Sequence, residues 1–310
     1  MDERRDTAGP PPLVPPLVPP LVIAHRGYSA VAPENTLAAF EAALRAGADV
    51  VETDLRPAAD GAVVLVHDAD VDGTTDGRGR VADLAAADLA RLDAGSWFSG
   101  AYRGQRLPLL ADLLDLLTAH PGAQLLLELK EVWTPAQVAA VLQQVRRAGA
   151  VDRVVLQSFE LLTLRRVRDQ APRVRLAVLV DDLPVDATTR ARALRRDLGV
   201  VACNPGAAAL VTRPGLVADL HGAGLGVWPW TVDAPALWDH VVRLGVDGVI
   251  TNRPDGLRGW LEARRSRDER PADPSALLLT ALAQRSRADR GRGPRPVVPV
   301  PTVAPALRSA

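Results

Sequence analysis

A regular alternation of short apolar segments with longer amphipathic segments constrains the fold of this chain more than any other feature. The short segments are rich in Val, Leu and Ile, which is typical of strands buried on both faces of a sheet. The longer segments between them have the spacing of helices with one apolar side. Because such helices connect parallel strands, the sequence predicts an α/β protein.

The number of these units decides between the α/β architectures. Eight strands that alternate with eight helices, in a segment of about 250 residues, favour a closed TIM (β/α)8 barrel over an open doubly wound sheet. Strands are predicted at residues 21–25, 49–55, 125–130, 153–158, 175–180, 200–204, 226–231 and 247–251. Helices are predicted at residues 36–46, 110–119, 135–148, 160–170, 188–198, 211–222, 234–244 and 255–264.

Both ends of the chain have a composition that does not suit a packed core. Residues 1–20 contain a Pro-Pro-Leu-Val repeat, which favours extended polyproline II structure. Residues 265–310 are rich in Arg, Asp, Pro and Ser. We therefore expect a barrel domain at residues 21–264 between a disordered N-terminal tail and a largely disordered C-terminal tail.

One region interrupts the strand–helix rhythm. The apolar run 62–66 follows Asp60-Gly61 too closely for a crossover helix, so it is expected to turn back as the second strand of a hairpin. A small insertion, about residues 68–108, would follow it. If the turn centres on Asp60-Gly61, antiparallel pairing sets Asp54 opposite His67 or nearly so.

Three carboxylates are predicted to lie together at the mouth of this barrel. Glu52 and Asp54 are two apart on the second strand and so share a face, and Glu128 lies on the third barrel strand. In an apolar interior their repulsion needs a compensating charge. Ligation by carboxylates alone favours one divalent cation, Mg²⁺ or Ca²⁺, with Mn²⁺ also possible. The alternative is that Glu52 and Asp54 form ordinary salt bridges.

Two histidines and two basic residues follow the same strands. His25 and His67 each lie at a strand end, where an imidazole can transfer protons at neutral pH, although a histidine there can also be purely structural. Arg26 and Lys130, the only lysine of the chain, would place positive charge on a phosphoryl oxygen. Their alternative role is to pair with Glu52 or Glu128 for stability.

Taken in order, these residues resemble the glycerophosphodiester phosphodiesterase family over about residues 21–260. The matching motifs are Ala24-His25-Arg26-Gly27, Pro33-Glu34-Asn35-Thr36, Glu52-Thr53-Asp54, His67-Asp68, Thr74-Thr75-Asp76-Gly77-Arg78-Gly79, Glu128-Leu129-Lys130, Gln157-Ser158-Phe159, Trp230-Thr231-Val232-Asp233 and Gly248-Val249-Ile250-Thr251-Asn252-Arg253-Pro254. One departure is Gly73, which stands where the family usually has an arginine before the paired threonines.

The resemblance implies a TIM barrel with a small insertion, metal ligands at Glu52, Asp54 and Glu128, and acid/base catalysis by His25 and His67. It implies a metal-dependent enzyme that hydrolyses glycerophosphodiesters, such as glycerophosphocholine or glycerophosphoethanolamine, to sn-glycerol 3-phosphate and an alcohol. It also suggests that six residues bind the substrate or its phosphate: Arg26, Lys130, Glu34, Asn35, Ser158 and Trp230. Two of these have plainer alternatives, an N-cap for Asn35 and barrel-top packing for Trp230.

Two other functions are compatible with the sequence. The barrel could act on a lipid, as a lysophospholipase D or a phospholipase C-like phosphodiesterase, with Trp97, Phe98 and Tyr102 as an apolar rim. It could also be a non-catalytic binding module. Equal numbers of basic and acidic residues, 37 each, predict no nucleic-acid partner and no stable membrane anchor. A single cysteine and an N-terminus without a secretory apolar segment predict a cytoplasmic protein.

Overall fold

The computed structural model describes residues 19–184 and 186–264. The predicted C-terminal tail, and residues 1–18 of the predicted N-terminal tail, lie outside these ranges. None of the helices in the described ranges is long and apolar enough to cross a membrane.

The centre of the molecule is a barrel of parallel strands, in the order β8-β7-β6-β5-β4-β2-β1-β9. Backbone hydrogen bonds from Asp247 N to Val227 O and from Ile250 N to Pro229 O, each 3.0 Å, connect the segments around β8 and β9 and bring the two ends of the sheet together. This confirms the predicted TIM-like α/β barrel. Its strands are β1 (Leu21–Ala24), β2 (Val50–Pro57), β4 (Gln124–Leu129), β5 (Val154–Ser158), β6 (Arg175–Val180), β7 (Ala202–Pro205), β8 (Gly226–Val227) and β9 (Gly248–Thr251).

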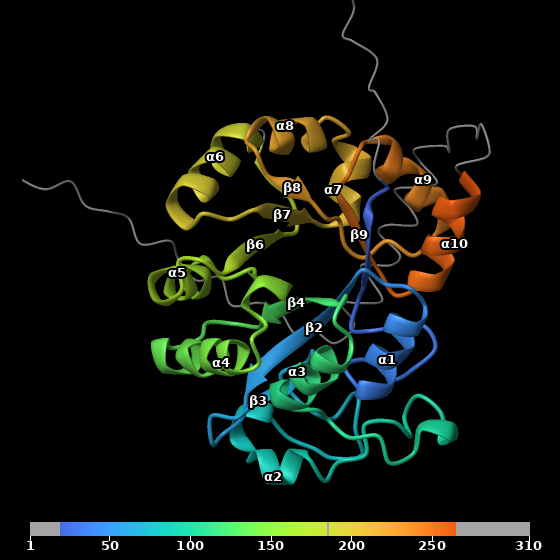
Figure 1. The fold of residues 1–310 in the computed structure, drawn as a ribbon, viewed down its shortest axis with the longest axis vertical. Helices are drawn as coiled ribbons and strands as arrows, with labels where there is room; N and C mark the ends of the chain where they lie inside the picture. The colour runs from blue at the N-terminus through green and yellow to red at the C-terminus, as the bar shows by residue number, and fades with distance from the viewer. Residues whose placement is uncertain (1–18, 185, 265–310) are drawn as a thin grey trace, which may run out of the picture.

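Helices surround the strands (Figure 1). They are α1 (Leu37–Arg45), α3 (Leu110–Ala119), α4 (Pro135–Arg147), α5 (Leu161–Gln170), α6 (Ala187–Leu198), α7 (Ala207–Thr212), α8 (Leu216–Gly222), α9 (Pro235–Arg243) and α10 (Pro254–Arg264). The single helix predicted at 211–222 is wrong, because Pro214 separates α7 from α8. The strand predicted at 226–231 is also too long, since Pro229 cannot donate a ladder hydrogen bond.

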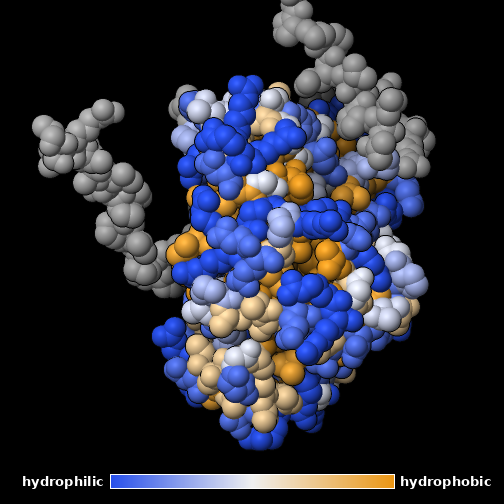
Figure 2. Space-filling view, turned by 60° about the vertical axis from the view of Figure 1, so that its left-hand side comes forward, coloured by the Kyte–Doolittle hydropathy of each residue, from blue (hydrophilic) through white to orange (hydrophobic). Residues whose placement is uncertain are grey.

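Strand side chains alternate between two apolar environments. Those that point outward join the helices in the main core, which includes Val22, Val51 and Leu127. Those that point inward fill one layer of the barrel interior: Ile23, Val50, Leu126, Val155, Ala177, Ala202 and Ile250. Because the side chains alternate, the residues two positions further along these strands also point inward. They form the next layer, which lies nearer the carboxyl ends of the strands. Polar side chains cover much of the outer face shown in Figure 2.

The predicted hairpin is present, with β3 (Val63–Leu65) antiparallel to β2. Its register pairs Arg56 with Val64, and Val66 N donates to Asp54 O at 3.0 Å. Val66 therefore lies opposite Asp54, one residue short of the predicted partner His67. The turn centres on Asp60 alone and not between Asp60 and Gly61, which accounts for the shift of one residue.

The segment between β3 and α3 has its own small core. It contains α2 (Ala86–Leu89) and two 3₁₀ turns, Val81–Asp83 and Gly100–Tyr102. Its apolar cluster consists of Ala58, Val64, Val66, Val71, Val81, Leu89, Ala94 and Leu107. The Tyr102 hydroxyl donates to Val31 O at 2.7 Å, which fastens this segment to the loop after β1.

Gly27 is a position where a side chain would be costly. Its φ is +78°, and an added Cβ would lie 2.6 Å from the carbonyl carbon of Ala39 in α1. We expect Gly27→Ala to lower the free energy of unfolding by about 2–4 kcal/mol, from backbone strain plus overpacking. Denaturant titration measures this loss.

Gly61 is a matched control for this prediction. It also has a positive φ, +82°, but an added Cβ there has no neighbour within 4 Å. We expect Gly61→Ala to cost only about 1 kcal/mol. Equal losses in the two variants would contradict the close packing of Gly27 against α1.

Candidate active site

Three carboxylates meet inside the barrel, as the strand alternation predicts. Glu52 and Asp54 point inward from β2, and the register pairs Asp54 with Glu128 on β4. Ligand oxygens of the three side chains lie within 4.8 Å of one another. The residues are 1%, 1% and 6% exposed, respectively, so water provides little screening.

The electrostatics of this cluster favour a bound cation. Burial, together with the charges of Asp54 and Glu128, raises the pKa of Glu52 well above its usual range. Burial also raises the pKa of Glu128. Among the described residues, Asp54 Oδ1 has no partner with hydrogen-bond geometry, although it forms an ion pair with Lys130. A hard divalent ion takes oxygen ligands and would remove the repulsion, so this donor set fits Mg²⁺ or Ca²⁺.

Two basic side chains offset part of the negative charge. Lys130 Nζ lies 2.9 Å from Asp54 Oδ1 and 2.7 Å from Glu128 Oε1. Arg26 Nε lies 3.4 Å from Asp54 Oδ2. Although burial opposes ionisation of Asp54, the charges of Lys130, His67 and Arg26 hold its pKa well below its usual range.

The loop after β1 orients Arg26 and Asp54. Arg26 Nη1 donates to Glu34 Oε1 at 2.8 Å, so Glu34 orients the guanidinium. Asn35 Nδ2 donates to Asp54 Oδ2 at 2.9 Å, and its Oδ1 accepts from Thr53 Oγ1 at 2.6 Å. The N-cap of α1 is Thr36, so the alternative N-cap role for Asn35 is wrong.

Two non-glycine residues of this loop have left-handed backbone. Arg26 and Asn35 both have φ +57°, a conformation that costs a non-glycine residue about 1–2 kcal/mol. Arg26 N donates to Glu52 Oε2 at 2.9 Å, so the unusual backbone contributes a hydrogen bond to the carboxylate cluster.

His25 is held by a short relay of hydrogen bonds. Asn252 Nδ2 donates to Asp233 Oδ2 at 2.6 Å, and Asn252 Oδ1 lies 2.7 Å from His25 Nδ1. A carboxylate only accepts, which fixes the orientation of the Asn252 amide. His25 Nδ1 must then be the donor, and the neutral ring keeps a free lone pair on Nε2.

His67 is held differently. Its Nδ1 lies 2.7 Å from Asp68 Oδ1, and Arg56 Nε donates to His67 O at 2.9 Å. Nδ1 is again the donor, but here the partner is an anion, which stabilises an imidazolium. Burial, followed by the positive charge of Arg26, lowers the pKa of each histidine to about 3. The charge of Asp54 acts on both rings in the opposite sense.

Ser158 and Trp230, the other two residues predicted to bind substrate, mainly connect neighbouring parts of the barrel. Ser158 Oγ donates to Leu129 O at 2.7 Å and accepts from Glu160 N at 3.1 Å, so its hydroxyl joins strands and loop. Trp230 Nε1 donates to Asn204 O at 2.9 Å, and the indole meets Phe159 edge to face at 5.5 Å.

Sequence reasoning assigned no role to Asp68, Asn252, Asp233, Gln157 or Asn204. The first four lie in motifs that the sequence shares with the family, but the motifs alone do not show which residues these side chains contact. Asn204 follows inward-facing Ala202 by two positions, and the alternation of β7 could have indicated it.

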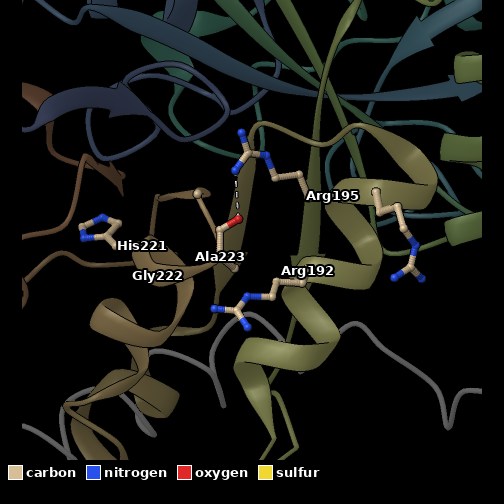
Figure 3. A pocket seen from close by; sticks show the side chains of 7 residues that line it. Arg192, Arg195, His221, Gly222 and Ala223 are labelled. Carbon is tan, nitrogen blue, oxygen red and sulfur yellow. Dashed lines mark hydrogen bonds between the residues drawn. The ribbon is translucent and has the colours of Figure 1, made fainter.

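A separate pocket of 630 Å³ lies between α6 and α8 and contains none of the predicted site residues. Arg192, Arg195, Arg196 and His221 line it with the backbone of residues 222–224 (Figure 3). Arg195 Nη1 donates to Ala223 O at 3.1 Å, directly after α8. Arg195 and Arg196 lie in the last turn of α6, and Arg195 also contacts the C-terminal end of α8, so these two guanidinium groups compensate the negative ends of helix dipoles.

Comparison with known proteins agrees with this geometry. Residues 25–256 match the model of the glycerophosphoryl diester phosphodiesterase family. A glycerophosphodiester phosphodiesterase of Caldanaerobacter subterraneus is 34% identical over 238 residues, 76% of this chain and 95% of the relative.

Solved structures show the same relationship. A phosphodiesterase of Oleispira antarctica, in complex with the product sn-glycerol-3-phosphate, has a TM-score of 0.72 and 28% identity and covers 79% of this chain and 97% of its own. A glycerophosphodiester phosphodiesterase of Agrobacterium tumefaciens has a TM-score of 0.67 and 30% identity and covers 77% of this chain and 99% of its own. The chain is a phosphodiesterase that belongs to the glycerophosphoryl diester phosphodiesterase family.

Proposed function

We propose that this enzyme hydrolyses glycerophosphodiesters, such as glycerophosphocholine or glycerophosphoethanolamine, to sn-glycerol 3-phosphate and an alcohol in a metal-dependent reaction. This proposal rests mainly on one observation: a buried carboxylate triad and two histidines, each held through Nδ1, lie together at one end of the barrel. The product bound to the Oleispira antarctica relative supports the same substrate class. The cytoplasmic location stays a prediction.

The chain's own residues account for binding of the phosphodiester. Glu52, Asp54 and Glu128 would hold one Mg²⁺ or Ca²⁺ ion, with Mn²⁺ as a third possibility. Such an ion would supply Lewis-acid stabilisation of charge on the phosphoryl oxygens. Arg26 and Lys130 add fixed positive charge beside the triad. Trp230 and Phe159 offer an aromatic corner against which a glycerol or head group can pack.

The different partners of the two histidines suggest different roles. The neutral amide of Asn252 favours a neutral His25 whose Nε2 accepts the proton of the attacking oxygen. The Asp68 carboxylate favours the protonated form of His67, against the burial and the charge of Arg26 that lower its pKa, so we assign to His67 the donation of an Nε2 proton to the leaving alcohol. These assignments give the same proton balance whether the attacking oxygen belongs to water or to a neighbouring hydroxyl of the glycerol.

One observation favours a lipid substrate as a second candidate. Five large apolar side chains are exposed in the part of the chain that the structure describes. Four of them, Val31, Trp97, Val132 and Leu162, lie in segments that follow β1, β3, β4 and β5, at the end of the barrel where the site opens. Apolar residues around a mouth can hold an acyl chain of a lysophospholipid.

Removal of the metal tests the principal proposal. We expect glycerophosphocholine hydrolysis to require added Mg²⁺, Ca²⁺ or Mn²⁺ and to stop in EDTA. Glu128→Gln should lower kcat/KM by about 10²-fold or more, because several kcal/mol of charge stabilisation depend on the ion. Glu41→Gln, on the exposed face of α1, is the matched control with unchanged activity. Full activity in EDTA would exclude a metal-dependent reaction.

A double-mutant cycle tests the relay to His25. His25→Ala should lower kcat by about 10²–10⁴-fold. Asn252→Ala should cause a smaller loss, and the double variant should be no slower than His25→Ala, because Asn252 acts through the ring. Single-turnover rates, with circular dichroism as a check of folding, measure these effects. Additive losses would contradict the positioning role of Asn252.

Paired substrates test the lipid candidate. If these exposed apolar residues hold an acyl chain, Trp97→Ser should lower turnover of lysophosphatidylcholine by about tenfold, because the acyl chain would lose part of its apolar contact area. Turnover of glycerophosphocholine should stay unchanged. Val201→Ser, at an exposed valine just before β7 at the opposite end of the barrel, is the control. Equal effects on the two substrates, or no lipid turnover by the wild type, would reject this candidate.

A further inference from the structure

A chain of amide side chains crosses the barrel interior from β7 to the carboxylate triad. Asn204 Nδ2 donates to Gln157 Oε1 at 2.9 Å. Gln157 Nε2 in turn donates to Glu52 Oε1 at 3.3 Å. The three residues are at most 1% exposed, so water does not compete for these hydrogen bonds.

The direction of this relay is fixed by the chemistry of its end. A carboxylate only accepts, so Gln157 must turn its NH₂ group toward Glu52. The oxygen of the Gln157 amide then faces β7, where it needs a donor. Asn204 supplies that donor through Nδ2, which locks the glutamine in one of its two orientations.

Glu52 differs from the other two carboxylates in its partners. Lys130 contacts both Asp54 and Glu128. Within the described ranges, no basic side chain forms an ion pair with Glu52; its partners are the backbone N–H of Arg26 at Oε2 and the amide of Gln157 at Oε1. Each oxygen thus accepts one hydrogen bond from a neutral group and keeps a lone pair for another ligand.

We propose that Gln157, held in orientation by Asn204, is a positioning residue that presents Glu52 as a ligand for the divalent cation. This inference rests on the metal site of the proposed function. Neutral donors fix the carboxylate without neutralising it, whereas a lysine in the place of Gln157 would replace the cation's charge. The relay therefore leaves Glu52 as the triad member whose charge depends most on the ion.

The test compares metal affinity in variants that keep the volume of the side chains. Gln157→Met removes the donor at nearly constant length, and Gln157→Met/Asn204→Leu also removes the second amide, so that no buried donor is left unpaired. We expect the Kd for Mg²⁺, measured by calorimetry without substrate, to rise by about 10–100-fold in both variants. The turnover number should approach the wild-type value when Mg²⁺ saturates the site.

Gln124→Met is the matched control, because Gln124 begins β4 at the opposite end of the barrel. It should keep the wild-type Kd. If Glu52→Gln abolishes Mg²⁺ binding while both relay variants bind Mg²⁺ as the wild type does, the relay has only a structural role and the inference is overturned. If the wild type binds none of Mg²⁺, Ca²⁺ and Mn²⁺, the metal site and the relay both fail.

Discussion

The rest of the site depends on three carboxylates that are buried together inside the barrel. Burial opposes the charged form of each, and each also repels the others. The two basic side chains of the site contact Asp54 and Glu128 but not Glu52. A cation bound by the three carboxylates would supply the positive charge that favours ionisation of Glu52, and carboxylate oxygens are ligands that hard cations prefer.

Most groups that could touch a substrate are held by a partner that limits their freedom. His25 has Asn252 and Asp233 behind it, Arg26 has Glu34, and Asp54 has Asn35. Glu34 lies in the same loop as Arg26, whereas Asn35, Asn252 and Asp233 come from loops after strands other than the one that carries the residue they hold. Such preorganisation lowers the reorganisation needed when charge develops in the reaction.

The inward direction of the triad was predictable because alternation along a strand depends only on sequence spacing. The barrel was predictable for the same reason, since its units repeat. The roles of Asn35 and Asn252 were not: one depends on a left-handed backbone and the other on a contact between residues 227 positions apart. The hairpin register, predicted with His67 opposite Asp54 or nearly so, was correct to within one residue, because the exact centre of the turn cannot be read from Asp60-Gly61 alone.

The two histidines differ in how they are attached to the fold. His25 directly follows a central barrel strand, whereas His67 follows the hairpin strand β3 and leads into the segment with its own small core. β3 and the Arg56 contact to its carbonyl tie His67 to the barrel. We therefore expect changes in the segment that carries Trp97 and Gly73 to shift His67 and Trp97 more than the triad. This separation allows substrate preference to vary around a constant metal site.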